Sequence, residues 1–116
     1  MMFPFQHKIW LYRKPIDFRK QIDGLVILIS AELKLDPTSG QLFIFRNQAG
    51  SKIKLLYWDE TGFWLLYKRL ERDRFKFPRI FDASMEVSRD QLQLLLSGID
   101  FEDQKLLKKV TAKKFY

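Results

Sequence analysis

The sequence contains no cysteine and only one histidine, His7. Without thiols the chain has no disulfide framework, no thiolate nucleophile and no cysteine-ligated metal site, and one imidazole cannot supply a site of several histidines. Long apolar runs are also missing, because the longest, LVILI at 25–29, is far shorter than the ~20 residues that span a bilayer. The N-terminal MMFPFQHKIW lacks the ordered regions of a signal peptide. The sequence therefore predicts a soluble, cytoplasmic protein without a metal or another cofactor.

Glycine and proline are also scarce, with five and four copies among 116 residues, and no repeat or internal linker is visible. In contrast, 47% of the residues are hydrophobic and 16% are aromatic, which is enough to fill one core. This composition predicts a single domain over residues 1–101. A basic C-terminal tail is expected over residues 102–116, which contain five lysines and no acid after Asp103.

Acidic residues are outnumbered, 14 against 21 lysines and arginines, which gives a net charge of +7. A basic surface gains affinity for nucleic acids by displacing counterions from phosphates. Charge alone does not distinguish a nucleic-acid binder from a basic domain that binds nothing acidic.

The hydrophobic pattern alternates between the periods of strands and helices. Asp17 is placed to cap a helix that runs to about Leu35, and Ser88 with Gln91 forms a capping box for a second helix that stops at Gly98. Period-two patterns predict strands at 8–14, 41–46, 52–58, 63–69 and 74–77. The expected fold class is α+β: an antiparallel sheet of about four to five strands, with a long helix packed on one face and a short C-terminal helix.

The segment KLLYWDETGFWLLYKRLER, residues 54–72, predicts a hairpin. Asp59 and Gly62 suit a type I turn followed by a left-handed glycine bulge. In that register one face is almost wholly apolar. The other face pairs Trp58 with Trp64 and Lys54 with Lys68. The two tryptophans either pack under the long helix or form a partner-binding face.

Three groups of basic residues are candidates for binding nucleic-acid phosphates. Like charges directly opposite cost up to ~1 kcal/mol, so an anion would stabilise the expected Lys54/Lys68 pair. In the expected strand 74–77, alternate side chains lie ~7 Å apart, close to the spacing of phosphates. Positive charge in the first turn of the long helix opposes the helix dipole unless an anion binds there. These groups are Lys54 and Lys68; Arg69, Arg72, Arg74 and Lys76; and Arg19 and Lys20. A solvated basic surface is the alternative for each.

A metal-dependent nuclease using Asp59, Glu60 and Glu71 is a further alternative, because such chemistry needs clustered carboxylates. The turn already uses Asp59, the expected cap uses Asp17, and arginines surround Glu71. The sequence therefore favours a protein that is not an enzyme.

Four blocks in order carry a resemblance to a known family: PIDFRKQIDGL, DPTSGQLFIFRN, KIKLLYWDETGFWLLYKRLERDRFKFP and LLLSGIDF. They resemble the TnpB (Orf2-like) accessory proteins of the IS66 family of bacterial insertion sequences, over roughly residues 3–101. The family pattern has glycine where this chain has Gln21 and Asp73. The resemblance implies a role in transposition beside a separate transposase that carries the catalytic acids, and it implies no catalytic residue in this chain.

Together these observations predict a non-catalytic accessory protein of transposition that binds the DNA backbone non-specifically or assists assembly of the transposition complex. The alternative is a protein adaptor that docks the transposase through Trp58 and Trp64 without touching DNA. Self-association is a further possibility for the same aromatic surface.

Overall fold

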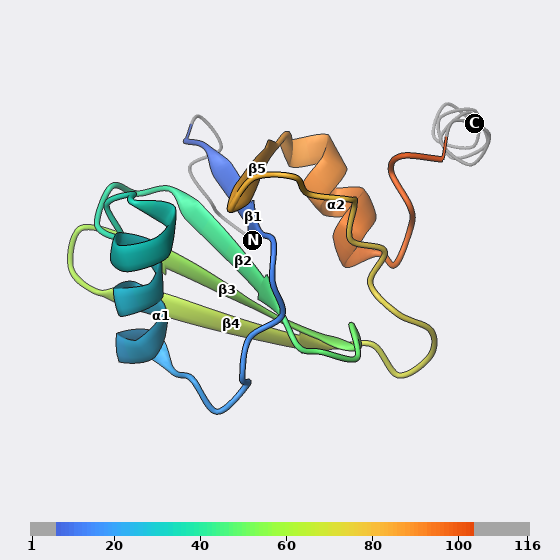
Figure 1. The fold of residues 1–116 in the computed structure, drawn as a ribbon, viewed down its shortest axis with the longest axis horizontal. Coiled ribbons are helices and arrows are strands. Elements are labelled where there is room, and N and C mark those ends of the chain that lie inside the picture. Colours follow the sequence, from blue (N-terminus) through green and yellow to red (C-terminus); the bar gives the residue numbers. More distant parts are fainter. Residues whose placement is uncertain (1–6, 104–116) are drawn as a thin grey trace.

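The computed structural model describes residues 7–103, which form a five-stranded sheet with helices on both faces (Figure 1). Its elements in chain order are β1 (Ile9–Tyr12), α1 (Ile22–Leu28) with its π-helical continuation η1 (Ile29–Leu33), β2 (Leu42–Arg46), β3 (Lys52–Trp58), β4 (Phe63–Arg69), β5 (Ser84–Val87) and α2 (Arg89–Leu96). None of the helices in 7–103 is long and apolar enough to cross a bilayer.

The strand order is β4-β3-β2-β1-β5. β1 and β2 are parallel and are joined by the α1/η1 crossover, whereas all the other neighbouring strands are antiparallel. The predicted α+β class is therefore confirmed, but the sheet is mixed rather than purely antiparallel. A parallel pair needs a long crossover connection, and the helix between β1 and β2 supplies it.

Each face of the sheet has its own apolar layer, because successive strand residues point to opposite sides. Leu25 and Ile29 of α1/η1 pack with Tyr12, Phe43 and Phe45. The opposite layer is covered by α2 and by the chain between β4 and β5, and contains the buried side chains of Ile9, Leu11, Leu42, Ile44, Ile53, Leu55, Phe75, Ile80, Val87, Leu92, Leu95 and Phe101.

The first helix is shorter than predicted, and Asp17 is not its N-cap. The helix begins at Ile22. Its N-cap residue is Gln21, whose side chain makes no capping hydrogen bond. Asp17 instead closes a turn: its carbonyl accepts the backbone N–H of Lys20, and its carboxylate accepts the N–H of Arg19. Arg19 and Lys20 therefore precede the helix, and the prediction that they oppose its dipole in the first turn is wrong.

The prediction of a strand at 74–77 is also wrong. The backbone N–H of Phe75 donates to the carbonyl of Gly50, 2.8 Å away, and no strand pairs with this segment. The fifth strand is β5, which pairs antiparallel with β1 from Tyr12↔Ser84 to Ile9↔Val87. Its four residues SMEV alternate between polar and apolar, and Met85 and Val87 both pack against the α2-side core.

The C-terminal helix agrees with the prediction. The hydroxyl of Ser88 accepts the N–H of Gln91, and the Gln91 side chain accepts the N–H of Ser88. Gly98 adopts a left-handed φ of 77° just beyond the helix, as expected for its stop. Most of the predicted basic tail, residues 104–116, lies outside the described residues.

The β3–β4 hairpin forms over the predicted residues, but its register differs from the prediction by one residue. Trp58 pairs with Phe63, Lys54 with Tyr67 and Lys52 with Arg69. The left-handed residue of the turn is Glu60, at φ 81°, rather than Gly62. Asp59 does organise the turn, since its carboxylate accepts from the N–H groups of Thr61 and Gly62 and from the indole of Trp64. A one-residue shift exchanges the faces of one strand relative to the other.

Lys34 has a left-handed backbone conformation, which a glycine would adopt more easily. Lys34 ends η1 at φ 54°, a left-handed conformation that costs a non-glycine residue about 1–2 kcal/mol. Glycine removes this cost but adds unfolded-chain entropy, so Lys34→Gly is expected to raise the free energy of unfolding by about 0.5–1 kcal/mol in a urea titration. As a control, Ala31→Gly in the helical region should lower it by a similar amount. A Lys34→Gly variant no more stable than the wild type contradicts this expectation.

Candidate nucleic-acid interface

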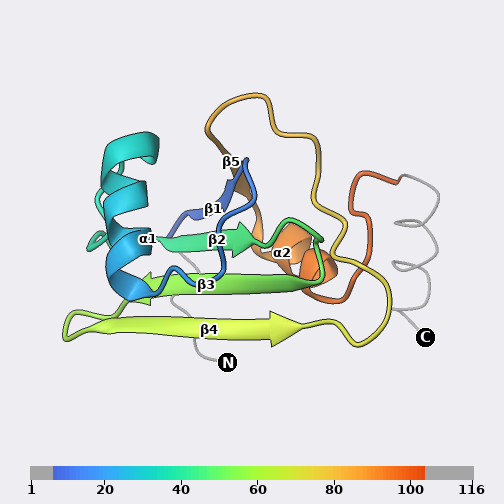
Figure 2. The same ribbon diagram turned by 60° about the horizontal axis from the view of Figure 1, so that its bottom comes forward.

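Basic residues at or just beyond the ends of four strands lie together at one end of the sheet. Because β1 and β2 are parallel, their C-terminal ends lie together, and the antiparallel order of β3 and β4 brings the start of β3 and the end of β4 to the same place. Figure 2 shows β2 and β4 pointing in the same direction. We call this surface the basic end; its residues are Arg13, Arg46, Lys52, Arg69, Arg72 and Arg74.

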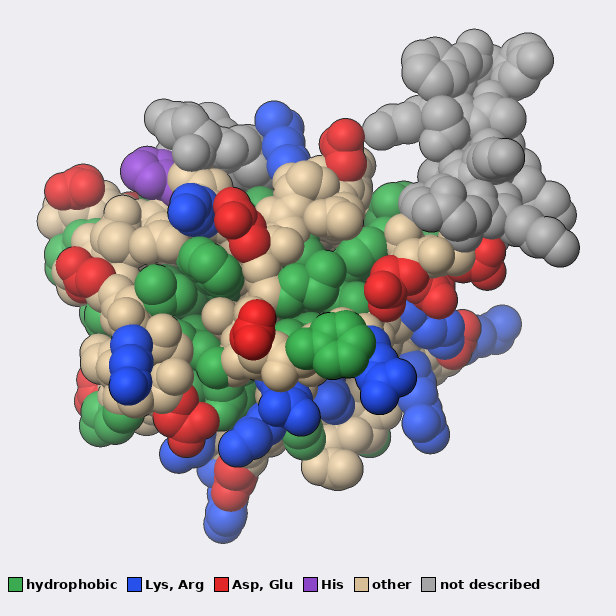
Figure 3. All heavy atoms as spheres, turned by 45° about the horizontal axis from the view of Figure 1, so that its top comes forward, with side chains coloured by type: hydrophobic (Ala, Val, Ile, Leu, Met, Phe, Trp, Pro, Cys, Tyr) green, Lys and Arg blue, Asp and Glu red, His purple; other side chains and the backbone are tan. Residues whose placement is uncertain are grey.

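The chain after β4 is tied to the basic end by backbone hydrogen bonds. The N–H of Leu70 donates to Ser51, and that of Phe75 donates to Gly50. Farther along, the Arg13 N–H donates to the Ala83 carbonyl at 3.0 Å. The bonds to Ser51 and Gly50 hold Arg72 and Arg74 beside the β2–β3 turn. In Figure 3 most lysine and arginine side chains on the face shown lie in its lower half.

Several predicted contact residues have acidic partners. Arg19 pairs with Asp17 at 2.6 Å, Arg69 with Glu71 at 2.9 Å, and Lys76 with Asp73 at 2.6 Å. Hydrogen bonding to Glu71 raises the pKa of Arg69, and hydrogen bonding to Lys76 lowers the pKa of Asp73. Because these pairs are exposed, each contributes little to stability, and a phosphate can compete for the cation.

Arg72 and Arg74 are exposed, and their side chains have no ion-pair or hydrogen-bonding partner among residues 7–103. The charge of Arg74 does help to lower the pKa of Asp73, whose carboxylate is bound mainly by Lys76. The Lys52 side chain is likewise without such a partner there, and it lies directly opposite Arg69 in the sheet. Like charges in directly opposite positions are unfavourable. The like-charge pair predicted at Lys54/Lys68 does not form. The observed register instead places two positive charges opposite each other at Lys52/Arg69.

Arg46 adds a partly desolvated charge to the basic end. Its guanidinium carbon lies 5.5 Å from the centre of the Phe77 ring, and one of its terminal nitrogens donates to the Arg13 carbonyl at 3.4 Å. Its Nε is buried without a hydrogen-bond partner among the described residues. Burial lowers the pKa of Arg46. The positive charge here is thus only partly compensated by the protein.

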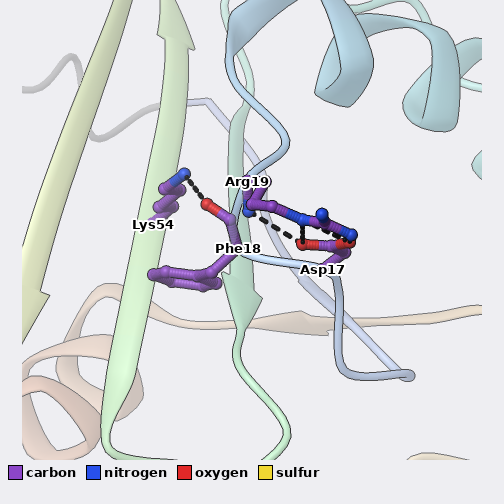
Figure 4. A network of polar contacts seen from close by, with 4 residues as sticks. All are labelled: Asp17, Phe18, Arg19 and Lys54. Atoms are coloured by element: carbon purple, nitrogen blue, oxygen red, sulfur yellow. Dashed lines mark hydrogen bonds and ion pairs between the residues drawn. The ribbon is translucent and has the colours of Figure 1, made fainter.

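Lys54 occupies a different environment from the one predicted. Only 4% of the residue is exposed, and its ammonium donates to the backbone carbonyl of Phe18 at 2.7 Å (Figure 4). It also donates to the carbonyl of Lys20 at 2.7 Å. The same ammonium lies 4.7 Å from the centre of the Phe18 ring. Burial lowers the pKa of Lys54, partly offset by the charge of Asp17. Lys54 therefore holds the 17–21 loop on the sheet rather than presenting its charge on the open surface.

Lys68 and the two tryptophans are also placed differently from the prediction. Lys68 pairs with Ile53 and donates to the Leu96 carbonyl at 2.8 Å, at the end of α2. Trp58 pairs with Phe63, and their rings meet edge to face at 4.9 Å between centroids. Trp64 pairs with Tyr57 on the opposite face and is 57% exposed. A shared Trp58/Trp64 face does not exist, because the observed register separates the two indoles.

The described part of the chain, residues 7–103, contains no group of three or more histidine or acidic side chains arranged to hold a metal ion. The carboxylates proposed for a nuclease have other surroundings. Asp59 is engaged by the hairpin turn, which lowers its pKa mainly through the Trp64 indole, and Glu71 is paired with Arg69.

Sequence reasoning missed Arg13, Arg46 and Lys52. Each lies at the boundary of a predicted strand, so each was visible in the sequence as a charge that begins or ends an apolar run. Their convergence depends on the parallel pairing of β1 with β2, which no local pattern indicates.

Comparison with known proteins identifies the family. The model of the family described as IS66 Orf2 like protein matches residues 7–106, so the chain belongs to the IS66 Orf2-like family of insertion-sequence accessory proteins. Two relatives from Sinorhizobium fredii (strain NBRC 101917 / NGR234) are similar over 94 residues: uncharacterized protein y4jC at 35% identity, covering 81% of this chain and 80% of the relative, and uncharacterized protein y4hO at 37%, covering 81% and 82%. No solved structure matches the chain.

Proposed function

We propose that this insertion-sequence accessory protein binds the DNA backbone without sequence specificity, through the basic end of its sheet. The observation that carries the proposal is the convergence there of Lys52, Arg72 and Arg74, three cations that form no ion pair among the described residues. Phosphates would relieve the repulsion between Lys52 and Arg69 and would supply the negative charge that Arg46 lacks as a partner.

The expected contacts are of the kind that position a protein on DNA without reading its bases. Long lysine and arginine side chains on a loop and at strand ends match phosphate oxygens. Neither helix of the described chain extends from the basic end as a reading element for the major groove, because α1 and α2 pack on the two sheet faces. Binding in a transposition complex would then depend mainly on charge.

The test removes two charges from the basic end. Arg72→Gln/Arg74→Gln is expected to weaken binding to a duplex oligonucleotide about tenfold near physiological salt and to reduce the slope of log affinity against log salt by about 2, since each phosphate contact contributes about 0.9. Fluorescence anisotropy at several salt concentrations measures both quantities. The loss should be the same on element-end and unrelated sequences.

A charge-matched variant provides the control. Lys8→Gln/Lys34→Asn removes the same net charge away from the basic end, and asparagine tolerates the left-handed conformation at position 34. Its affinity should lie within about twofold of the wild type. Equal losses in the two double variants would show that net charge, not this surface, governs binding. Absence of salt-sensitive binding to any DNA would overturn the proposed function.

The alternative of an adaptor that docks the transposase through Trp58 and Trp64 loses its common surface, because the indoles lie on opposite faces. Association with the separate transposase, or with a second copy of this chain, remains a prediction that co-purification can test.

A further inference from the structure

A pocket lies beside the basic end, on the α1 face of the β3–β4 hairpin. It has a volume of about 510 Å³, within the range of small-ligand pockets. The 17–21 loop and the two strands form its walls, which are lined by Asp17, Phe18, Arg19, Gln21, Lys52, Lys54, Leu65 and Tyr67. Of the residues that form the basic end, only Lys52 lines this pocket.

The charge of the pocket is unbalanced. Asp17 is its only acid and is already bound by Arg19, through three side-chain hydrogen bonds of 2.6–3.1 Å. Lys52 and Lys54 therefore contribute two positive charges, and neither has a carboxylate within ion-pair distance among the described residues. The pocket is suited to an anion.

Lys54 makes this a built site rather than a collection of surface lysines. Two backbone carbonyls hold its ammonium in place, and the residue is almost fully buried. An ammonium has three donors, so one remains after the two carbonyl bonds. A cation fixed before binding loses little conformational entropy when an anion reaches it, unlike a free surface lysine.

One wall of the pocket is aromatic. The Phe18 and Tyr67 rings pack edge to face, with centroids 5.8 Å apart. Phe18 is held over Lys54, whereas Tyr67 is 52% exposed on the edge strand β4. An exposed ring beside a positive pocket is the arrangement by which proteins stack an unpaired base while binding its phosphate.

We propose that this pocket binds one nucleotide unit of single-stranded DNA, with its base stacked on Tyr67 and its phosphate at Lys52 and Lys54. The inference rests on the proposed function, because Lys52 belongs both to this pocket and to the basic end. Duplex DNA is bound by the basic end alone, since paired bases cannot reach the Tyr67 ring. An unpaired strand leaving the duplex passes into the pocket.

Two exposed aromatic residues of the same strand provide a matched test. Tyr67 lies on the pocket face and Trp64 on the opposite face, and they are similarly exposed. Binding of a 3′-labelled oligothymidylate of about ten nucleotides, within the usual site size of single-strand binders, is measured by anisotropy. Tyr67→Ala should weaken it about tenfold, whereas Trp64→Ala should leave it within twofold and Tyr67→Phe should bind like the wild type.

The same variants titrated with duplex DNA separate this inference from the proposed function. Duplex affinity should be unchanged in Tyr67→Ala. If this variant does not fold, Tyr67→Ile keeps strand propensity without an aromatic ring and should show the same loss. Duplex binding without oligothymidylate binding, or equal effects of Tyr67→Ala and Trp64→Ala, overturns the inference and leaves the proposed function standing. Absence of binding to both DNAs overturns both.

Discussion

Lys54→Met is expected to lower the free energy of unfolding by about 3 kcal/mol. Methionine preserves most of the aliphatic stem on the face of the sheet that α1 covers. It removes the ammonium that binds the carbonyls of Phe18 and Lys20. Leaving a partly buried acceptor unsatisfied costs about 1–3 kcal/mol, and two acceptors lose their partner. The cation–π contact with Phe18 is lost as well.

Replacing a buried charge by an apolar residue is often neutral when its partner is replaced too. The partners of Lys54 cannot be replaced in this way, because they are backbone carbonyls, which every substitution leaves in place. The stabilising removal of a desolvated charge is therefore smaller than the cost of two unpaired carbonyls. Local opening should begin at the 17–21 loop, where backbone amides should exchange hydrogen faster than in the wild type.

Urea unfolding of Lys54→Met and Lys52→Met measures the effect against a control in the same strand. The Lys52 side chain makes no polar contact within residues 7–103, so its substitution should change stability by no more than about 0.5 kcal/mol. Similar free energies of unfolding for the two variants would contradict the structural role assigned to Lys54.

The bounds of the β3–β4 hairpin could be predicted from local patterns. The bounds of β3 and β4 agree with the alternation of apolar residues, and the capping box of α2 is visible in the four residues SRDQ. Such features are set by interactions within a few residues. The same holds for Asp59, whose short side chain organises the DETG turn.

The pairing of the hairpin could not be predicted, because one residue of difference in the turn decides it. DETG is compatible with a three-residue loop that has Gly62 left-handed, and with the observed four-residue loop in which Glu60 takes φ 81°. In the observed structure, the four-residue loop occurs together with burial of Lys54 against the 17–21 loop. The consequence was large, since it moved Trp64 and Lys68 to the face opposite Trp58 and Lys54.

Asp73 shows how a family pattern gains physical meaning from the structure. The resemblance indicates glycine at this position, and the backbone there is left-handed at φ 68°. Aspartate tolerates this conformation better than most residues. Its carboxylate also accepts from the Arg74 N–H at 2.9 Å and from Lys76 at 2.6 Å. Aspartate at this position thus keeps the turn and pairs with Lys76, whereas Arg72 and Arg74 form no ion pair within 7–103.

Tyr12 is expected to make the fold sensitive to alkaline conditions. The residue is 4% exposed, and its hydroxyl donates to a carboxylate oxygen of Glu32 at 2.5 Å. Burial, and then the hydrogen bond and the charge of Glu32, raise the pKa of Tyr12 to about 12. In the unfolded chain the phenol titrates near pH 10. The folded state therefore retains a proton that the unfolded state has lost as pH rises from about 10 to about 12.

A state that binds more protons is destabilised by raising the pH. The contribution of Tyr12 is fully present below about pH 10 and is lost by about pH 12, which amounts to roughly 2–3 kcal/mol. Urea titrations across this range should show a smaller alkaline loss in Tyr12→Phe than in the wild type, because other titrating groups cancel in the comparison. Equal losses would contradict the assignment.

Glu32→Gln separates the two causes of the alkaline effect. Glutamine still offers an oxygen to the Tyr12 hydroxyl but removes the negative charge that opposes ionisation. Burial is the largest cause and is unchanged by this substitution, so the alkaline loss should fall between those of the wild type and Tyr12→Phe. A loss in Glu32→Gln as small as in Tyr12→Phe would show that the charge of Glu32, rather than burial in the α1-side layer, keeps the phenol neutral.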